Sequence, residues 1–268
     1  MRILTAAIFS TIFIASGLCL ADEEPKVTGS AGLGIFNRYV FRGYELSGRS
    51  VILQPNLGIA YRGFSLSLLG NIDSDEQATQ SFNPDRPGHA SFNERDITLS
   101  YTHNIGKFGL TGGYIFYSTD YAPATQELFV SASYDIIAKP TISVYRDVAK
   151  FPGTYVNLSF SQSFKVHREI TLDLGASAGY FAGDGGYWRT FDASTGGYTG
   201  KKYRAFHDGM ASAGITFPVT NFIAVQPVVQ YWFPLSSKAR RMVDGNSYNP
   251  NGHLDDTWVT GMNVKISF

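Results

Sequence analysis

Apolar and polar residues alternate along the last thirteen residues of the chain, 256–268. One parity carries the apolar side chains Trp258, Met262, Val264, Ile266 and Phe268, whereas the other parity is mostly polar. Successive side chains of a β-strand point to opposite faces, so this segment predicts a strand with one apolar and one mostly polar face. In a soluble protein the apolar face would meet a core. In a membrane barrel it would meet lipid, and the polar face would line a wet lumen.

The same alternation recurs from Thr28 onward and predicts twelve strands, separated in turn by short turns and longer polar connections. The short turns are expected at 62–63, 105–107, 138–139, 167–168 and 220–221, and the longest loops at 73–91, 183–204 and 234–255. An even strand count places both termini and all the short turns at one end, with the long loops at the other. The fold class predicted is all-β: a transmembrane antiparallel β-barrel of twelve strands in the outer membrane of a Gram-negative bacterium.

The first residues of the chain resemble an export signal. Arg2 precedes a mostly apolar run, 3–20, and Cys19-Leu20-Ala21 offers a small-x-small cleavage site. Two alternatives are a membrane anchor, since the run approaches spanning length, and a lipoprotein attached through Cys19. Leu18 stands where a lipid-attachment site needs a small side chain, which disfavours the second. We expect a signal peptide at 1–21 and a single barrel domain at 22–268.

The composition narrows the classes of function. Aromatic residues make up 15% of the chain, charged residues only 16%, and there are 28 glycines, which fits a barrel that hides half of each strand from water. Basic and acidic residues number 22 each, so there is no electrostatic footprint for nucleic acid. The one cysteine lies in the expected signal peptide, and the five histidines show no metal-ligand spacing. We therefore expect no disulfide and no cofactor.

If the apolar parity faces lipid, charged residues of the other parity line the lumen. The expected pore-lining residues are Arg38, Arg42, Glu94, Asp96, Glu127, Asp147 and Asp173. Arginines facing carboxylates would set up a transverse field that sorts solutes by charge, with Arg38 and Arg42 opposite Glu94 and Asp96. The alternative is that these groups pair and close the lumen as struts. Twelve strands fall between small filled barrels and large open ones, which favours a narrow pore.

Enzymes also use membrane barrels, so we looked for catalytic residues. His89-Ala90-Ser91 is superficially similar to the His-x-Ser pair of outer-membrane lipid hydrolases, but the preceding prolines place it in a loop. A polar loop triplet is the simpler interpretation, and we expect no enzyme activity. His207 falls near a strand end and is expected at the membrane interface. Arg146 lands on the lipid-facing parity, which indicates either a β-bulge or a position at the outer rim.

The segment Asn37-Arg38-Tyr39-Val40-Phe41-Arg42-Gly43 carries a family resemblance. Its Tyr-x-Phe-Arg-Gly pattern resembles the signature of the TorF-type porin family, and the similarity extends through 54–57 and 63–64 to 71–73. Family members often have a serine and an acidic residue before the tyrosine, where this chain has Asn37 and Arg38. The resemblance implies an outer-membrane channel, with no particular solute, and points to Arg42 as a functional residue.

Together these observations predict a passive channel for small polar or charged solutes, filtered by a charge-lined lumen. The rival interpretations are a non-conducting structural or adhesin-like barrel, a lipid hydrolase using Ser91, and a soluble periplasmic sandwich. The expected partners are outer-membrane lipids and lipopolysaccharide, small solutes, and the barrel-assembly machinery acting through the strand that ends at Phe268.

Overall fold

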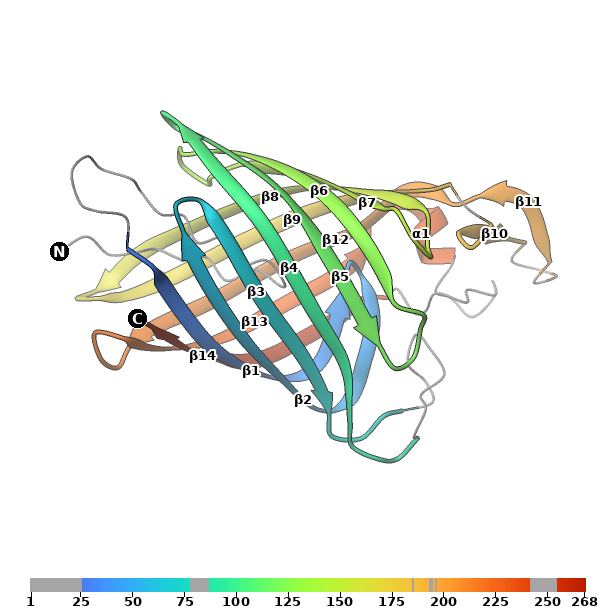
Figure 1. The fold of residues 1–268 in the computed structure, drawn as a ribbon. Coiled ribbons are helices and arrows are strands. Elements are labelled where there is room, and N and C mark those ends of the chain that lie inside the picture. Colours follow the sequence, from blue (N-terminus) through green and yellow to red (C-terminus); the bar gives the residue numbers. More distant parts are fainter. Residues whose placement is uncertain (1–25, 78–86, 185, 193–194, 196, 242–254) are drawn as a thin grey trace.

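The computed structural model describes residues 26–77, 87–184, 186–192, 195, 197–241 and 255–268. The signal peptide expected at 1–21 lies outside these residues. Twelve strands of the described part form one closed antiparallel barrel (Figure 1). They are β1 (Thr28–Phe41), β2 (Tyr44–Tyr61), β3 (Phe64–Asp73), β4 (Ser91–Ile105), β5 (Phe108–Thr119), β6 (Thr125–Tyr134), β7 (Thr141–Asp147), β8 (Gly153–His167), β9 (Ile170–Gly183), β12 (Arg204–Pro218), β13 (Ile223–Pro234) and β14 (Thr257–Ser267).

The first and last strands close the barrel. β1 pairs with β14 from Ser30 opposite Ser267 to Phe36 opposite Gly261. Beyond the strand, the backbones of Gly29 and Phe268 exchange two hydrogen bonds of 2.6 and 2.9 Å. Each of the twelve strands thus pairs with a neighbour on both sides, which a barrel in lipid requires because the bilayer core offers no water to an open edge. The predicted fold class is confirmed.

The connections are sorted between the two ends of the barrel, as predicted. Arg62 (φ 49°) and Gly63 (φ 85°) form a two-residue turn between β2 and β3, with the left-handed backbone pair that suits hairpin twist. Figure 1 shows the first residues of β1 and the C-terminal end of β14 at this end, and the connections from β5 to β6 and from β7 to β8 at the other. Two of the expected loops contain regular structure that the sequence did not indicate: the two-stranded sheet β10 (Arg189–Phe191) and β11 (Tyr198–Lys202), and helix α1 (Ser237–Arg241).

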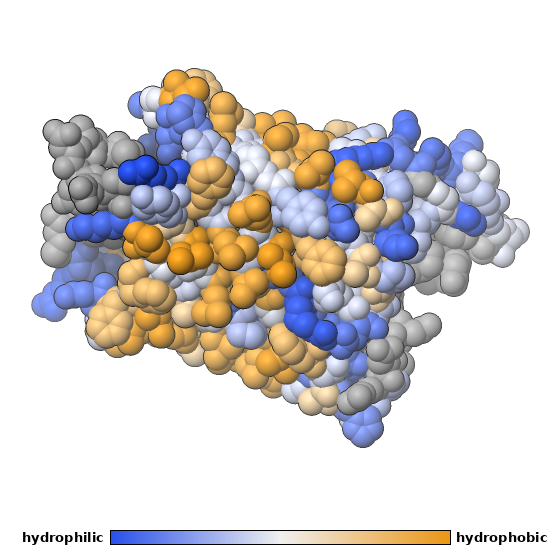
Figure 2. Space-filling model, in the orientation of Figure 1, coloured by the Kyte–Doolittle hydropathy of each residue, from blue (hydrophilic) through white to orange (hydrophobic). Residues whose placement is uncertain are grey.

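The exterior of the barrel is apolar and the interior polar. Along β4, exposed Ile97 and Leu99 alternate with buried Asp96, Thr98 and Ser100. The same inversion holds on other strands, where the exposed residues include Leu57, Ile59, Leu66, Leu68, Leu110, Leu128, Val130, Leu158 and Phe160. Figure 2 shows apolar side chains gathered in a broad band over the middle of one face, with hydrophilic residues toward the ends. This is the pattern of a wall that faces lipid outside and water inside.

The helix that the structure describes is too short and too polar to cross a membrane.

Candidate functional site

The ends of β1 and β2 leave the barrel wall and form a hairpin of their own. Pairing of β1 with β14 stops at Phe36, and pairing of β2 with β3 begins at Ile52. Between these points, residues 38–48 pair only with each other in the strand ladder, after irregularities in register at Phe36/Arg38 and Tyr39/Val40. We call residues 38–48 the inner hairpin. In Figure 1 these ends of β1 and β2 bend away from the neighbouring strands.

The inner hairpin crosses the lumen to the opposite wall. In the closed strand order, β7 lies six strands from β1 in either direction, flanked by β6 and β8. The Arg42 guanidinium nevertheless donates two hydrogen bonds of 2.7 Å to the two carboxylate oxygens of Glu127 in β6. The side chains of this ion pair are only 13% and 8% exposed. The hairpin tip therefore spans the barrel interior.

Aromatic rings surround the same guanidinium. Its Cζ lies 4.6 Å from the ring centroids of both Tyr145 and Tyr155, within the range of cation–π attraction. The Tyr117 hydroxyl donates to Glu127 at 3.0 Å and so fixes the carboxylate. We call the four wall residues Tyr117, Glu127, Tyr145 and Tyr155 the Arg42 cage. It combines a planar two-oxygen acceptor with ring faces, and both features match a guanidinium.

The rest of the inner hairpin contacts other parts of the wall. Val40 is buried in a cluster with Met210 of β12, Trp232 of β13 and Val259 of β14. The Tyr44 ring packs against the ring of His207 on β12, with 4.9 Å between their centroids. Together with the Arg42 cage, these contacts involve most of the barrel circumference. The inner hairpin therefore occupies part of the barrel interior at the level of Glu127.

Two wall carboxylates, Glu94 and Asp96, face the flank of the inner hairpin. They occupy alternate positions of β4 and interact directly with each other, and both are buried, at 3% and 6% exposed. Glu94 accepts a hydrogen bond of 3.1 Å from the Tyr121 hydroxyl, and the buried Tyr39 side chain lies beside the pair. Neither carboxylate forms an ion pair with any residue that the structure describes. This part of the wall therefore carries two adjacent acidic side chains.

The sequence analysis placed Arg38 and Arg42 across the lumen from Glu94 and Asp96, with ion pairing of the lumen charges as the alternative, and the structure pairs both arginines with other carboxylates. Arg42 binds Glu127 in place of Glu94 or Asp96, and Arg38 pairs at 2.5 Å with Glu45 of the same inner hairpin. The prediction from strand parity assumed that β1 stays in the barrel wall as far as Arg42. The hairpin bends inward before that point, so its side chains reach partners that strand parity cannot predict.

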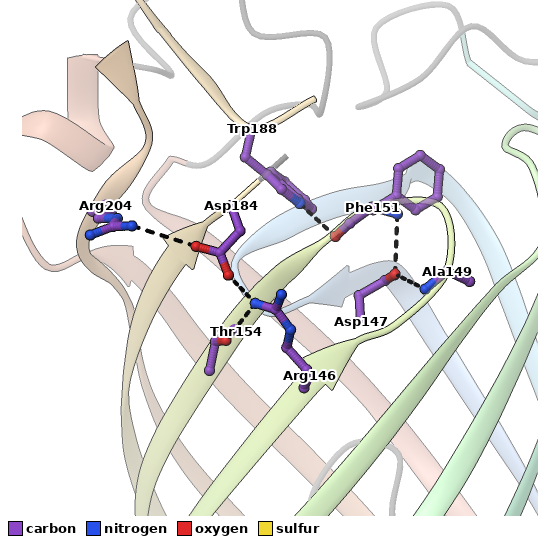
Figure 3. Close-up of polar contacts among 8 residues, drawn as sticks. All are labelled: Arg146, Asp147, Ala149, Phe151, Thr154, Asp184, Trp188 and Arg204. Atoms are coloured by element: carbon purple, nitrogen blue, oxygen red, sulfur yellow. Dashed lines mark hydrogen bonds and ion pairs between the residues drawn. The ribbon is translucent and has the colours of Figure 1, made fainter. Parts of the chain in front are cut away.

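The last two expected lumen residues have structural partners. Asp147 accepts hydrogen bonds from the backbone amides of Ala149 and Phe151 and so shapes the β7–β8 loop (Figure 3). Asp173 lies nearer the other end of the barrel. Its carboxylate accepts hydrogen bonds from Ser163, Thr171, Thr216 and Gln226. Hydrogen-bond donors that lie close in space thus hold both carboxylates in place.

Two residues lie elsewhere than the sequence indicated. Because Arg38 was expected to face the lumen, strand parity placed the next residue, Tyr39, towards lipid, but the register irregularities of β1 turn it inward, and it is 3% exposed. His207 was expected at the membrane interface and is instead fully buried, where its Nδ1 hydrogen-bonds the Tyr203 hydroxyl at 2.7 Å. The sequence analysis also did not identify the tyrosines of the Arg42 cage as site residues. Nothing in their local pattern separates a cage ring from any other lumen or interface aromatic.

Arg146 lies at the outer rim. No register shift interrupts the pairing of β7 with either neighbour, which excludes a bulge there. Its guanidinium pairs with Asp184, which also contacts Arg204 at 3.5 Å (Figure 3). The hydrogen bond from Arg146 lowers the pKa of the Asp184 carboxyl. Ser91 of the His89-Ala90-Ser91 triplet is the first residue of β4 and pairs with Asp73, while His89 and Ala90 precede the strand.

Solved structures share this architecture. The chain is similar to the NanC porin, with a TM-score of 0.50 and 10% sequence identity over 90% of this chain and 99% of that one. An outer-membrane channel from Pseudomonas putida F1 matches with a TM-score of 0.48 and 7% identity, over 91% and 95% of the two chains. No protein-family model and no curated protein matches the chain. The chain therefore has the closed β-barrel fold that the NanC porin also has. Its resemblance to the TorF-type porins still depends on the sequence motif at 37–43 and on the similarity at 54–57, 63–64 and 71–73.

Proposed function

We propose that this outer-membrane barrel is a channel for the passive diffusion of small polar or charged solutes, and that the inner hairpin forms its constriction. The proposed route passes between the hairpin and the wall that carries Glu94, Asp96 and Glu127. In this proposal Arg38, Arg42, Asp147 and Asp173 also bound the lumen. Outer-membrane lipids, lipopolysaccharide and the barrel-assembly machinery are proposed partners.

The observation that carries the proposal is the pair of interior carboxylates without a counter-charge. A buried charge that lacks a partner costs several kcal/mol in a dry interior, on the order of 3–5 kcal/mol when a pair is broken. A closed plug would be more stable with neutral residues at Glu94 and Asp96. In an open, water-filled state of the channel, water would hydrate both groups, and their field would act on passing ions. The excess of interior carboxylates supports a preference for cations.

The family resemblance gives independent support, because its motif residues belong to the inner hairpin. Tyr39 lies beside the acidic pair, Arg42 enters the cage, and Gly43 (φ 82°) completes the two-residue turn with Arg42 (φ 49°). A pattern typical of TorF-type porins thus coincides with the part of the chain that narrows this lumen.

Planar-bilayer recordings of the refolded mature protein test the proposal. We expect unitary conductance with a preference for K⁺ over Cl⁻. Arg42→Glu places a second carboxylate beside Glu127 and expels the hairpin tip, so conductance and cation preference should both rise. Arg62→Glu, at a turn of the same backbone shape with an exposed side chain, is the matched control and should change neither. Folded protein that carries no current, with or without Arg42→Glu, would instead establish the non-conducting structural barrel.

A further inference from the structure

The Arg42 cage has the composition of a ligand site, and its present occupant belongs to a hairpin that is separate from the wall. We propose that the Arg42 cage is a binding site for small solutes that carry a guanidinium group, and that Arg42 occupies it as a tethered ligand. The inference rests on the proposed channel function only for the route by which a solute arrives. Binding to the cage does not itself require conduction.

The contacts of Arg42 select a planar guanidinium over a compact ammonium ion. Two parallel hydrogen bonds of equal length, 2.7 Å, join its Nη1 and Nη2 to the two oxygens of Glu127. A guanidinium presents its N–H groups in a fixed fork that matches both carboxylate oxygens, whereas an ammonium acts as a point charge. The faces of Tyr145 and Tyr155, both 4.6 Å from Cζ, add cation–π attraction to a flat cation.

All four residues of the cage belong to the barrel wall, and the Phe41 ring of the inner hairpin packs edge-on against one of them, Tyr117. β5, β6, β7 and β8 are consecutive neighbours, and none of the three pairings between them contains a register shift. Tyr145 of β7 pairs directly with Tyr155 of β8. Two residues further along β7, Asp147 pairs with Glu127 of β6. The Tyr117 hydroxyl holds the Glu127 carboxylate from the neighbouring strand. The cage should therefore keep its shape when the arginine is removed.

The turn itself does not require Arg42 to enter a cage. Arg62-Gly63 forms a turn of the same shape, with φ values of 49° and 85° against 49° and 82° for Arg42-Gly43, and Arg62 is exposed. The buried position of Arg42 is therefore determined by the cage and not by the backbone. Removal of its guanidinium would leave Glu127 buried without a counter-charge, which is a strong electrostatic demand for a cation.

Isothermal titration calorimetry of methylguanidinium chloride into folded Arg42→Met protein, in detergent micelles at constant ionic strength, tests the proposal. Methionine keeps much of the length of arginine and removes the charge. We expect saturable binding that is about tenfold or more tighter than binding of methylammonium, because the ammonium loses one charged hydrogen bond. The wild-type protein, whose cage is filled, should bind at least about tenfold more weakly than the variant. Adding Glu127→Gln to Arg42→Met should abolish binding, and Arg38→Met should bind no better than wild type.

A second measurement needs no substitution. If methylguanidinium competes with Arg42, it should speed amide hydrogen exchange of residues 38–48 in wild-type protein, while methylammonium at the same concentration does not. The inference is overturned if Arg42→Met binds no methylguanidinium, if binding survives Glu127→Gln, or if hairpin exchange is insensitive to the cation. Binding without current would refute the channel and leave the cage site standing. Current without binding would refute the cage site and leave the proposed channel standing.

Discussion

The Arg42–Glu127 ion pair should control how firmly the inner hairpin is docked. Both side chains are mostly buried. Two short hydrogen bonds join them, although the two residues lie 85 positions apart in the sequence. Removing one partner of a buried pair costs about 3–5 kcal/mol, because the other charge remains uncompensated. Water in the lumen relieves part of this cost, so we take the lower end, about 3 kcal/mol. Since about 1.4 kcal/mol corresponds to a factor of ten, Arg42→Gln or Glu127→Gln should raise the undocked fraction about 100-fold.

The double variant separates this mechanism from a simple loss of contacts. With Gln at both positions neither charge is left alone, and the two amides can hydrogen-bond, so we expect a cost of about 1 kcal/mol. Native-state hydrogen exchange of the amides in 38–48, with the amides of β5 as an internal reference, measures the local opening free energy. The double variant should exchange more slowly than either single variant, and Arg62→Gln should match wild type. Additive effects of the two substitutions would refute the reasoning, because uncoupled residues show no interaction energy.

Two further predictions concern the barrel itself. The pKa of Asp184 is lowered in the folded protein, so its ion pair with Arg146 stabilises the fold above the ordinary aspartate pKa, and that contribution is lost as the pH falls through the lowered value. The pair is exposed and the effect should stay below about 1 kcal/mol; urea unfolding in micelles between acidic and neutral pH should show it for wild type and not for Asp184→Asn. At the β1–β14 seam, a Cβ added at Gly261 would lie 2.3 Å from the Ile35 carbonyl oxygen, whereas at Gly112 the nearest atom is 4.0 Å away. Gly261→Ala should therefore cost about 1–3 kcal/mol or prevent closure, and Gly112→Ala should lower the unfolding midpoint far less; equal effects would contradict the model of a tightly packed seam.

The amino-acid sequence by itself determined the barrel wall. The alternation in strands such as β4 and β8 is a local signal, repeated in every hairpin, and the Arg62-Gly63 turn follows from the backbone that a two-residue hairpin needs. The number of strands, the closure of the barrel and the lipid-facing side of the strands could therefore be predicted from the sequence. The charge of Arg42 and its place in a family motif also marked it as functional.

Only the tertiary structure decided what Arg42 does. Strand parity says which side of a sheet a residue faces, but it does not say where a strand end leaves the sheet. The register irregularities after Phe36 turn the inner hairpin inward, bury Tyr39, and carry Arg42 to Glu127 in place of Glu94 and Asp96. The cage tyrosines become a site only when barrel closure brings β5–β8 opposite β1. Such contacts join residues far apart in sequence, and no short-range pattern encodes them.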